Sequence, residues 1–455
     1  MNQNNKNLKR KLGLISVTSL AVGSAVGAGI FTTIGDVAAH AGSSLFLILA
    51  LAICSLFQIP SSLCYAQLSS AYPEDGGHYV YFKKANLKCF AFLSGWISLF
   101  ATDVPTISMM GLALVNYLSI LFPLNNLLLK FIAVGVIIFI SIMHIRSVEG
   151  GDKLQTFLTA FKIIPFILII LIGVFFIKPE LIFDSSQNTN SDFGNLGPLG
   201  AAFPMFAAIS VAFFAFDGLY SPCYVSGEIK NPKRNLPGGL ILASIIILVL
   251  YVSLTCVTCG ILSIDEITSS SAPISLLASK FPLIGSSAKY IVAVVACIVI
   301  TGALSSCMMY QPRIEYAMAR DGYFFEIFGR VSEKYTTPSF AIAFHCIVSI
   351  ALMFVSDLSS ILNYYTIVIL FKHLGAFVCM LLLKNKKDYK PTYKAPFGDA
   401  LPIFCIIFIC VCMVSTVIQV GQVGTIIAIV VTLSGVPAYY LWDYWKNKKS
   451  SKTTN

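Results

Sequence analysis

Long apolar segments recur along the whole chain, and only short polar stretches separate them. About 20 residues at a rise of 1.5 Å per residue are enough for a helix to cross roughly 30 Å of hydrocarbon. We therefore predict an all-α integral membrane protein with twelve transmembrane helices. The predicted spans are 13–38, 44–70, 89–116, 127–146, 154–177, 200–228, 237–262, 288–312, 338–355, 358–384, 400–419 and 422–445.

The composition agrees with this interpretation and argues against a soluble protein. The chain is 57% hydrophobic and 11% charged, whereas soluble domains carry about 25% charged residues. The longest polar gaps run to roughly 25 residues, which is short for a separate soluble domain. We therefore treat 1–455 as a single membrane domain.

The basic residues alternate between the two predicted sides of the membrane. With both termini in the cytoplasm, 25 of the 31 Lys and Arg residues fall in the inner segments and four in the outer ones. Such a bias follows the positive-inside rule and sets the orientation in a cell membrane, with an even number of spans. It also explains the net charge of +10 without a nucleic-acid partner.

Two predicted spans contain helix-breaking residues at matching places. The first span holds the glycine-rich run 23–31, and the sixth holds Asp217 and Gly218, followed by Pro222. Close packing of small residues is an alternative for the first span alone. Breaks in corresponding spans of two halves are typical of transporters built from inverted repeats. The offset of five spans predicts repeats at 13–177 and 200–384, with two additional helices at 400–445.

Such breaks have a chemistry that suits an amino acid. The helix that restarts after Gly27, Ala28 and Gly29 would offer N–H donors and a positive dipole end to a carboxylate. Carbonyl groups near Ala25 and in the segment 214–217 would accept hydrogen bonds from an ammonium group. A single zwitterion would satisfy both sets of groups.

Several motifs carry a resemblance to a known family. They are Gly27–Phe31 (GAGIF), Tyr72–Tyr81 (YPEDGGHYVY), Phe214–Gly218 (FAFDG) with Gly227–Pro237 (GEIKNPKRNLP), and the segment Arg313–Gly322. In this order they resemble the amino acid–polyamine–organocation superfamily, in its branch of L-type amino acid transporters and bacterial amino acid exchangers. The resemblance covers nearly the whole chain and implies the LeuT-like fold, a 5+5 inverted repeat with broken helices 1 and 6.

The resemblance also implies a substrate site. The substrate-binding residues would be Ala25, Gly27, Ala28, Gly29, Ile30, Phe214, Ala215, Phe216 and Asp217. Phe214 would be an aromatic gate over the site, and its alternative is a packing or lipid-facing phenylalanine. The chain departs from the family pattern where Ala28 replaces a serine and Leu219 replaces a tryptophan.

Lys162 matches the fifth-span lysine of sodium-independent members of the family. There the ammonium replaces a sodium ion and bridges the first and eighth spans, where Thr301, Ser305 and Ser306 would add oxygens nearby. The alternative is a lysine that reaches up to the membrane interface. Lys162 lies about 12 Å inside the predicted cytoplasmic end, which is deep for that alternative.

Two further charges lie deep in spans and have no place in the family pattern. Asp103 in the third span and Lys372 in the tenth lie at about the same depth. Because intramembrane charges usually pair inside the helix bundle, we predict a buried Asp103–Lys372 pair beside the substrate path. The alternatives are a contact between Asp103 and the substrate, or pairing of Lys372 with Asp217.

The sequence thus predicts a sodium-independent amino acid transporter that works by alternating access, as an exchanger or a proton-linked permease, for neutral amino acids. The alternative is a membrane amino acid sensor, although such proteins often carry a longer soluble tail. The five histidines and the cysteines form no metal or nucleophile motif, so we expect no enzyme, cofactor or metal. Residues 116–126 contain no cysteine, so we expect no accessory glycoprotein.

Overall fold

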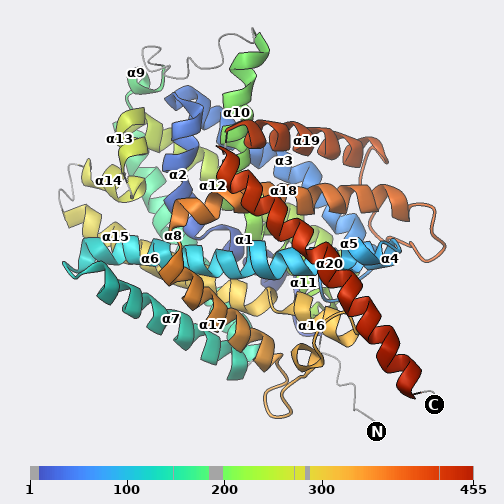
Figure 1. Ribbon diagram of the computed structural model, residues 1–455. Coiled ribbons are helices and arrows are strands. Elements are labelled where there is room, and N and C mark those ends of the chain that lie inside the picture. Colours follow the sequence, from blue (N-terminus) through green and yellow to red (C-terminus); the bar gives the residue numbers. More distant parts are fainter. Residues whose placement is uncertain are drawn as a thin grey trace.

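The computed structural model describes residues 10–146, 148–183, 198–270, 272–281, 287–419 and 421–453. Within these ranges the regular structure is helical, with two isolated β-bridges at Leu12–Ile229 and Asp75–Val225. Figure 1 shows the helices gathered into one bundle. The predicted all-α class agrees with this architecture.

The first half of the chain forms helices at the first five predicted spans. The elements of this half are α1 (Leu14–Ala25), α2 (Ala28–Ala41), α3 (Ser44–Ala71), α4 (His78–Lys84), α5 (Lys88–Ile97), the π-helix η1 (Ser98–Asp103), α6 (Val104–Leu121), α7 (Asn126–Arg146), α8 (Val148–Gly173), the 3₁₀ turn η2 (Val174–Phe176) and α9 (Pro179–Ile182). The short helices α4 and α9 lie outside those spans.

The second half continues in the same way. Its elements are α10 (Pro198–Ala212), the 3₁₀ helix η5 (Phe213–Tyr220), α11 (Ser221–Tyr224), the 3₁₀ turn η6 (Ser226–Glu228), α12 (Pro232–Ile261), α13 (Ile264–Ser269), α14 (Pro273–Ser279), α15 (Ala288–Tyr310), α16 (Arg313–Arg320), the 3₁₀ turn η8 (Glu326–Gly329), α17 (Ser339–Val355), α18 (Leu358–Leu383), α19 (Ala400–Gln419) and α20 (Gly421–Thr453).

Many of these helices are long and apolar enough to cross a membrane. Among the described residues, ten helices meet that criterion by length and composition, and two shorter apolar helices lie at Phe161–Phe176 and Ser339–Val355. Large apolar side chains are exposed on the outside of the bundle, for example Phe175 on η2 and Ile347 on α17. Apolar side chains on this scale are stable only against lipid, so the chain is a multi-pass membrane protein.

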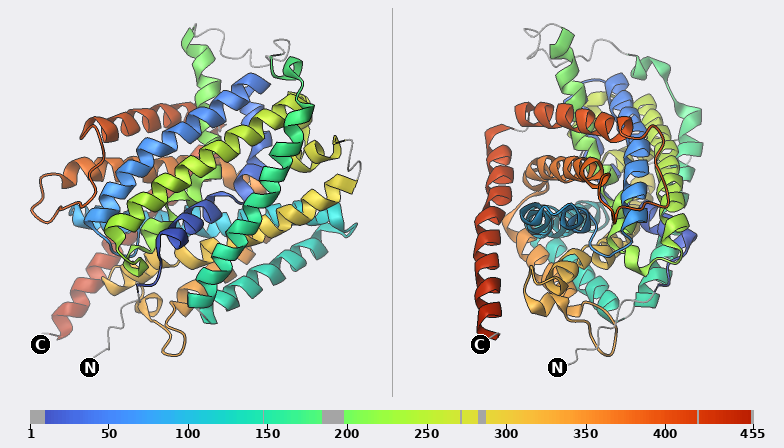
Figure 2. Two further views of the ribbon diagram at one scale, coloured as in Figure 1. Left: turned by 180° about the vertical axis from the view of Figure 1, so that it is seen from behind. Right: turned by 90° about the vertical axis from the view of Figure 1, so that its right-hand side faces the viewer.

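The two predicted broken spans lie in the interior. The helix α1 packs against α12, α8, α15 and η5, and η5 also contacts α2. By contrast, α20 lies along one edge of the bundle (Figure 2) and packs on α5 and α18. The short helices α9, α13 and α14 gather at one end, whereas α4, α16 and the C-terminal end of α20 lie at the other (Figure 1). This division separates the predicted outer loops from the predicted inner ones.

The backbone departs from a regular α-helix in three spans. The first span is two helices that meet at Val26–Gly27, as the glycines suggested. The sixth span, where helix-breaking residues occur, is wound at Phe213–Tyr220 into a 3₁₀ helix, which is tighter than an α-helix. The third span contains the π-helix η1 and extends to Leu121, five residues beyond the predicted end.

Candidate functional site

The break in the first span depends on two glycines that have no room for a side chain. A Cβ atom at Gly27 would lie 2.4 Å from the Cβ of Ala303 on α15, and one at Gly29 would lie 2.6 Å from the Cα of Ala215 on η5. Real Cβ atoms essentially never approach so closely. These glycines therefore let the start of α2 sit directly against α15 and the second break.

The second break packs against the first from the other side. A Cβ atom at Gly218 would lie 2.3 Å from the carbonyl carbon of Ser24, at the end of α1. The two broken spans are thus in backbone contact, although about 190 residues separate them along the chain. The predicted juxtaposition of the breaks is present.

Tyr251 on α12 joins the two breaks. Its hydroxyl oxygen lies 2.8 Å from the carbonyl oxygen of Ala25 and 3.0 Å from that of Ala215. The hydroxyl carries one proton, so it satisfies one of these carbonyls at a time. Both carbonyls are among the acceptors that the sequence predicts for a substrate ammonium, so Tyr251 lies beside the predicted site. Sequence reasoning missed it, although a lone tyrosine in the apolar run 245–257 was an available signal.

A small cavity lies between the breaks. It measures about 10 Å³ and is lined by Ser24, Ala25, Gly29, Thr106, Met110, Phe214, Asp217, Gly218, Cys307 and Tyr310. Such a volume holds about one water molecule, so the site is closed around its centre. Of the predicted residues, Ala25, Gly29, Phe214 and Asp217 line the cavity, whereas Ala215 and Phe216 face Tyr251.

The remaining predicted contacts lie close to this cavity. Gly27 is the residue before α2, Ala28 is the first residue of that helix, and Ile30 is buried in its first turn. Thr106 and Met110 come from α6, and Cys307 and Tyr310 from α15. Sequence reasoning missed these four, because no sequence motif marks the neighbouring helices that close the site.

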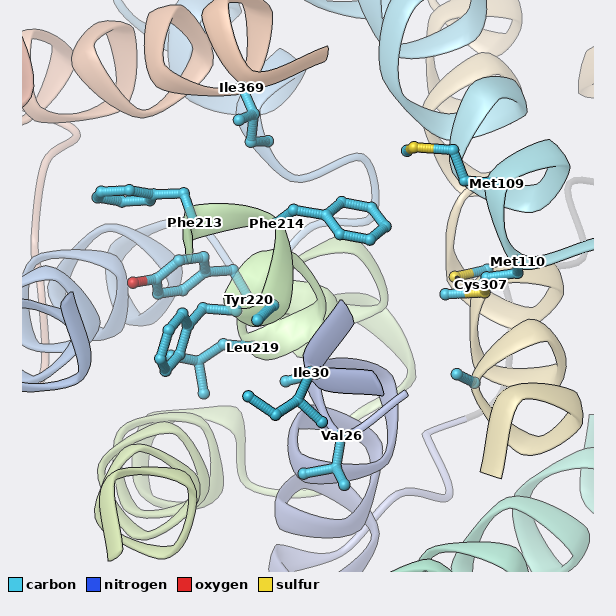
Figure 3. Packing of buried hydrophobic residues seen from close by; sticks show 14 of the residues in the cluster. Val26, Ile30, Met109, Met110, Phe213, Phe214, Leu219, Tyr220, Cys307 and Ile369 are labelled. Carbon is cyan, nitrogen blue, oxygen red and sulfur yellow. Dashed lines mark hydrogen bonds between the residues drawn. The ribbon is translucent and has the colours of Figure 1, made fainter. Parts of the chain in front are cut away.

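Phe214 extends from η5 into the space between the breaks and α6. Figure 3 shows its ring pointing toward Met109 and Met110, while the ring of Phe213 points the opposite way. The Phe214 ring also meets Tyr365 of α18 edge-on, with ring centroids 5.2 Å apart. This position, buried and on the cavity wall, differs from the lipid-facing alternative.

Lys162 lies in the interior and contacts the first broken span. Its side chain is fully buried, and Nζ donates a hydrogen bond to the carbonyl oxygen of Gly23 at 2.6 Å. Gly23 is in the last turn of α1, where the helix dipole favours a positive charge. This contact rules out a lysine that reaches the interface.

The hydroxyls predicted near Lys162 on the eighth span are bonded elsewhere. Ser305 pairs with His144 of α7, with 2.8 Å between Oγ and Nε2. Ser306 and Thr301 donate to the carbonyl oxygens one turn earlier in their own helix. The structure therefore shows Lys162 bonded to the first span, and it places these hydroxyls in other contacts.

Asp103 and Lys372 lie together, as their depths predicted. Lys372 Nζ is 3.7 Å from Asp103 Oδ1, and both side chains are almost fully buried. Thr102 bridges them: its Oγ1 accepts from Lys372 at 3.0 Å and donates to Asp103 Oδ1 at 2.9 Å. Thr102 and Asp103 are the last two residues of the π-helix η1. Short π-helical segments often occur at functional sites. Asp217 lies near Lys372 and Tyr365.

The motifs around Asp75, Gly227 and Arg313 converge at one end of the bundle. Asp75 accepts a hydrogen bond from the backbone N–H of Gly227 at 2.9 Å. Arg313 Nε lies 3.2 Å from Glu228 Oε1, and this pair is buried. Residues from these motifs line a second cavity of about 440 Å³. Burial raises the pKa of Asp75 to about 7, and the Glu228 carboxylate acts in the same direction.

Comparison with known proteins places the chain among transporters. A sequence model described as amino acid permease matches residues 12–435. The serine/threonine exchanger SteT of Bacillus subtilis (strain 168) is 27% identical over 97% of this chain and 98% of its own length. The b(0,+)-type amino acid transporter 1 of Mus musculus is 25% identical over 96% of this chain and 89% of its own. The cystine/glutamate transporter of Homo sapiens is 26% identical over 97% of this chain and 87% of its own length.

Proposed function

The chain belongs to the amino acid permease family, and from that premise we propose that it carries amino acids across a cell membrane by alternating access. One observation supports this most directly. The two broken spans are packed together around a closed cavity, where the first turn of α2 meets the carbonyl groups of Ala25 and Ala215. Donors and acceptors so arranged match the two charged ends of an amino acid.

We assign the substrate carboxylate to the N-terminal turn of α2, at Gly27, Ala28 and Gly29. The ammonium group would displace the Tyr251 hydroxyl from one carbonyl, either Ala25 or Ala215. Because the closed cavity is too small for an amino acid, Phe214 and its neighbours must move when substrate enters. Phe214 then acts as the gate, since its ring already separates the breaks from α6.

Sodium independence follows from Lys162 in this proposal. The ammonium group supplies a fixed positive charge at the C-terminal end of α1, where a sodium-coupled transporter would need a bound cation. The arrangement of twelve spans as a 5+5 inverted repeat with two additional helices is part of the same proposal. It is supported by broken helices five spans apart and by helical segments at all twelve predicted positions.

The substrate class is proposed to be neutral amino acids, and the orientation places both termini in the cytoplasm. The name of one relative describes an exchanger of serine and threonine, which supports exchange as one mode of transport. Proton-linked uptake is the other mode. The loop between α6 and α7 carries no cysteine, so the transporter is proposed to work without an accessory glycoprotein.

Transport by the purified protein in liposomes tests this function. Labelled L-serine, L-threonine, L-leucine, L-lysine and L-glutamate would be offered in choline buffer, with and without unlabelled amino acid inside. We expect uptake of at least one neutral amino acid, and equal rates in sodium and choline. A steep sodium requirement would contradict the role of Lys162. Binding without uptake of any amino acid would indicate the sensor alternative.

A further inference from the structure

A buried chain of four aromatic side chains links segments far apart in the sequence. The Tyr65 hydroxyl oxygen on α3 lies 2.6 Å from Nε2 of His78 on α4 and 2.7 Å from Nδ1 of His373 on α18. Nδ1 of His78 lies 3.2 Å from the hydroxyl oxygen of Tyr224 on α11. All four side chains are at most 6% exposed. These contacts form one continuous hydrogen-bonded chain, Tyr224–His78–Tyr65–His373.

The protons in this chain have two complete arrangements. The Tyr65 hydroxyl has one hydrogen, so it donates to one histidine and accepts from the other. In the first arrangement Tyr224 donates to His78, His78 to Tyr65, and Tyr65 to His373. In the second, His373 donates to Tyr65, Tyr65 to His78, and His78 to Tyr224. Each contact is satisfied in both arrangements, with both histidines neutral.

The conversion of one arrangement into the other moves a proton. A proton that joins Tyr224 from outside the chain pushes the Tyr224 hydrogen to His78 Nδ1. His78 then passes its Nε2 hydrogen to Tyr65, Tyr65 passes its own to His373 Nδ1, and His373 gives the hydrogen on Nε2 to a water molecule. One proton enters and one leaves, and the four side chains end without net charge. The reverse order moves a proton the other way.

The surroundings connect this chain to the transport site. Tyr224 contacts Tyr310 of the substrate cavity, with ring centroids 5.3 Å apart, and the Lys372 ammonium lies 5.9 Å from the Tyr224 ring. His78 directly precedes Tyr79, which lines the second cavity, of about 440 Å³, beside Asp75. The other ionisable groups that face the chain are Tyr81 of α4, Tyr220 of η5, Cys223 of α11, Lys372 of α18 and, farther along, Asp103 and Asp217.

The charge of Lys372 links proton uptake by the four hydrogen-bonded side chains to the transport cycle. The Lys372 ammonium lies near both histidines, and its charge disfavours an added proton on His78. Burial also lowers the pKa of His78 well below its ordinary value, so this histidine is neutral near pH 7. Asp103 lies beside Lys372, and its Oδ2 atom is buried with no hydrogen-bond partner among the described residues. A movement of substrate that shifts this ion pair therefore changes how readily the chain accepts a proton.

We propose that the Tyr224–His78–Tyr65–His373 chain is a proton pathway, and that amino acid transport by this protein is linked to proton movement through it. The inference rests on the proposed transport function and names the proton as the second transported species. It selects proton linkage over exchange alone as the mode of net uptake.

The test uses the purified full-length protein in liposomes with the membrane potential held at zero. The labelled amino acid is the one of the panel above that is exchanged fastest, and entrapped pyranine reports internal pH. If one proton accompanies each substrate, a gradient of one pH unit should give about tenfold accumulation. Substrate addition should also acidify the interior. Loss of both signals is expected for Tyr65→Phe, which keeps the ring stacked on Tyr220 but removes the joining oxygen.

Amino acid exchange measured without a pH gradient distinguishes a loss of proton linkage from a loss of transport itself. Tyr65→Phe should keep amino acid exchange within about threefold of the parent, equivalent to about 0.7 kcal/mol, because only the coupling to protons is lost. Tyr290→Phe, on the exposed face of α15, is the matched control and should keep both proton signals. If Tyr65→Phe does not fold, His78→Gln and His373→Gln interrupt the same chain. The proposal is overturned if uptake by the parent does not depend on the pH gradient. It is also overturned if uptake by the substituted proteins still responds to the gradient. Absence of exchange by the parent would instead refute the transport function.

Discussion

The substitution Gly27→Ala probes the contact between the first break and α15. The added methyl would lie 2.4 Å from the Cβ of Ala303, whereas ordinary contacts begin near 3.4 Å. The helices must separate by about 1 Å, and overpacking of this kind costs about 1–3 kcal/mol. Because the closed site needs this contact, the population of the closed state should fall by about 5- to 150-fold.

The double variant Gly27→Ala/Ala303→Gly removes the opposing methyl and should restore the contact. Its remaining cost is about 1 kcal/mol for a glycine inside α15. The control is Gly135→Ala on α7, where an added Cβ meets nothing within 4 Å. The assay is amino acid exchange in liposomes, together with the melting temperature of each purified variant.

The expected order of exchange rates is parent and Gly135→Ala first, the double variant next, and Gly27→Ala last. Full activity in Gly27→Ala would show that the break is not packed against α15. A double variant as impaired as the single one would show that Ala303 is not the neighbour that matters. Either result refutes the packing on which the closed site depends.

Three other predictions concern charged side chains. Lys162→Ala should lower the exchange rate more than the apparent affinity, because Lys162 holds α1 in place, and a sodium requirement in the parent would contradict this role. Asp103→Ala and Lys372→Ala should each lower the free energy of unfolding by about 3–5 kcal/mol, measured by thermal denaturation. Replacing both residues with neutral ones should recover part of this loss. If the two losses simply add in the double variant, the residues are not coupled. The pKa of Asp75 is raised to about 7, so its protonated form stabilises the fold at low pH and this contribution is lost as pH rises toward and through 7. The melting temperature of Asp75→Asn, which keeps the acceptor for Gly227, should therefore fall less between pH 5 and 8 than that of the parent; equal slopes would contradict the shift.

The sequence pattern predicts the helices well because the membrane imposes one length and one composition on each span. Helical segments occur at all twelve predicted positions, and the first break lies at Gly27, where the glycines indicated it. The meeting of Asp103 with Lys372 was also predictable, since buried opposite charges at one depth have few other partners.

Other features depend on geometry that periodicity does not encode. The spacing of apolar residues does not distinguish the i→i+5 hydrogen bonds of the π-helix at Ser98–Asp103 from the i→i+4 hydrogen bonds of an α-helix. This π-helix ends at Asp103, which lies beside Lys372. The position of Tyr251 follows from the packing of α12 against two segments distant in sequence. The chain through Tyr65 joins residues up to 308 positions apart, so only the assembled bundle reveals it.

The central claim is that the two breaks form an amino acid site. The most direct measurement compares amino acid exchange by the parent and by Gly29→Leu, both purified and monodisperse, in liposomes with choline buffer. A side chain at Gly29 would project against the backbone of Ala215 and fill the place assigned to the substrate carboxylate. We predict exchange by the parent and none by Gly29→Leu; exchange at the parent rate by a correctly folded Gly29→Leu would contradict the proposed site.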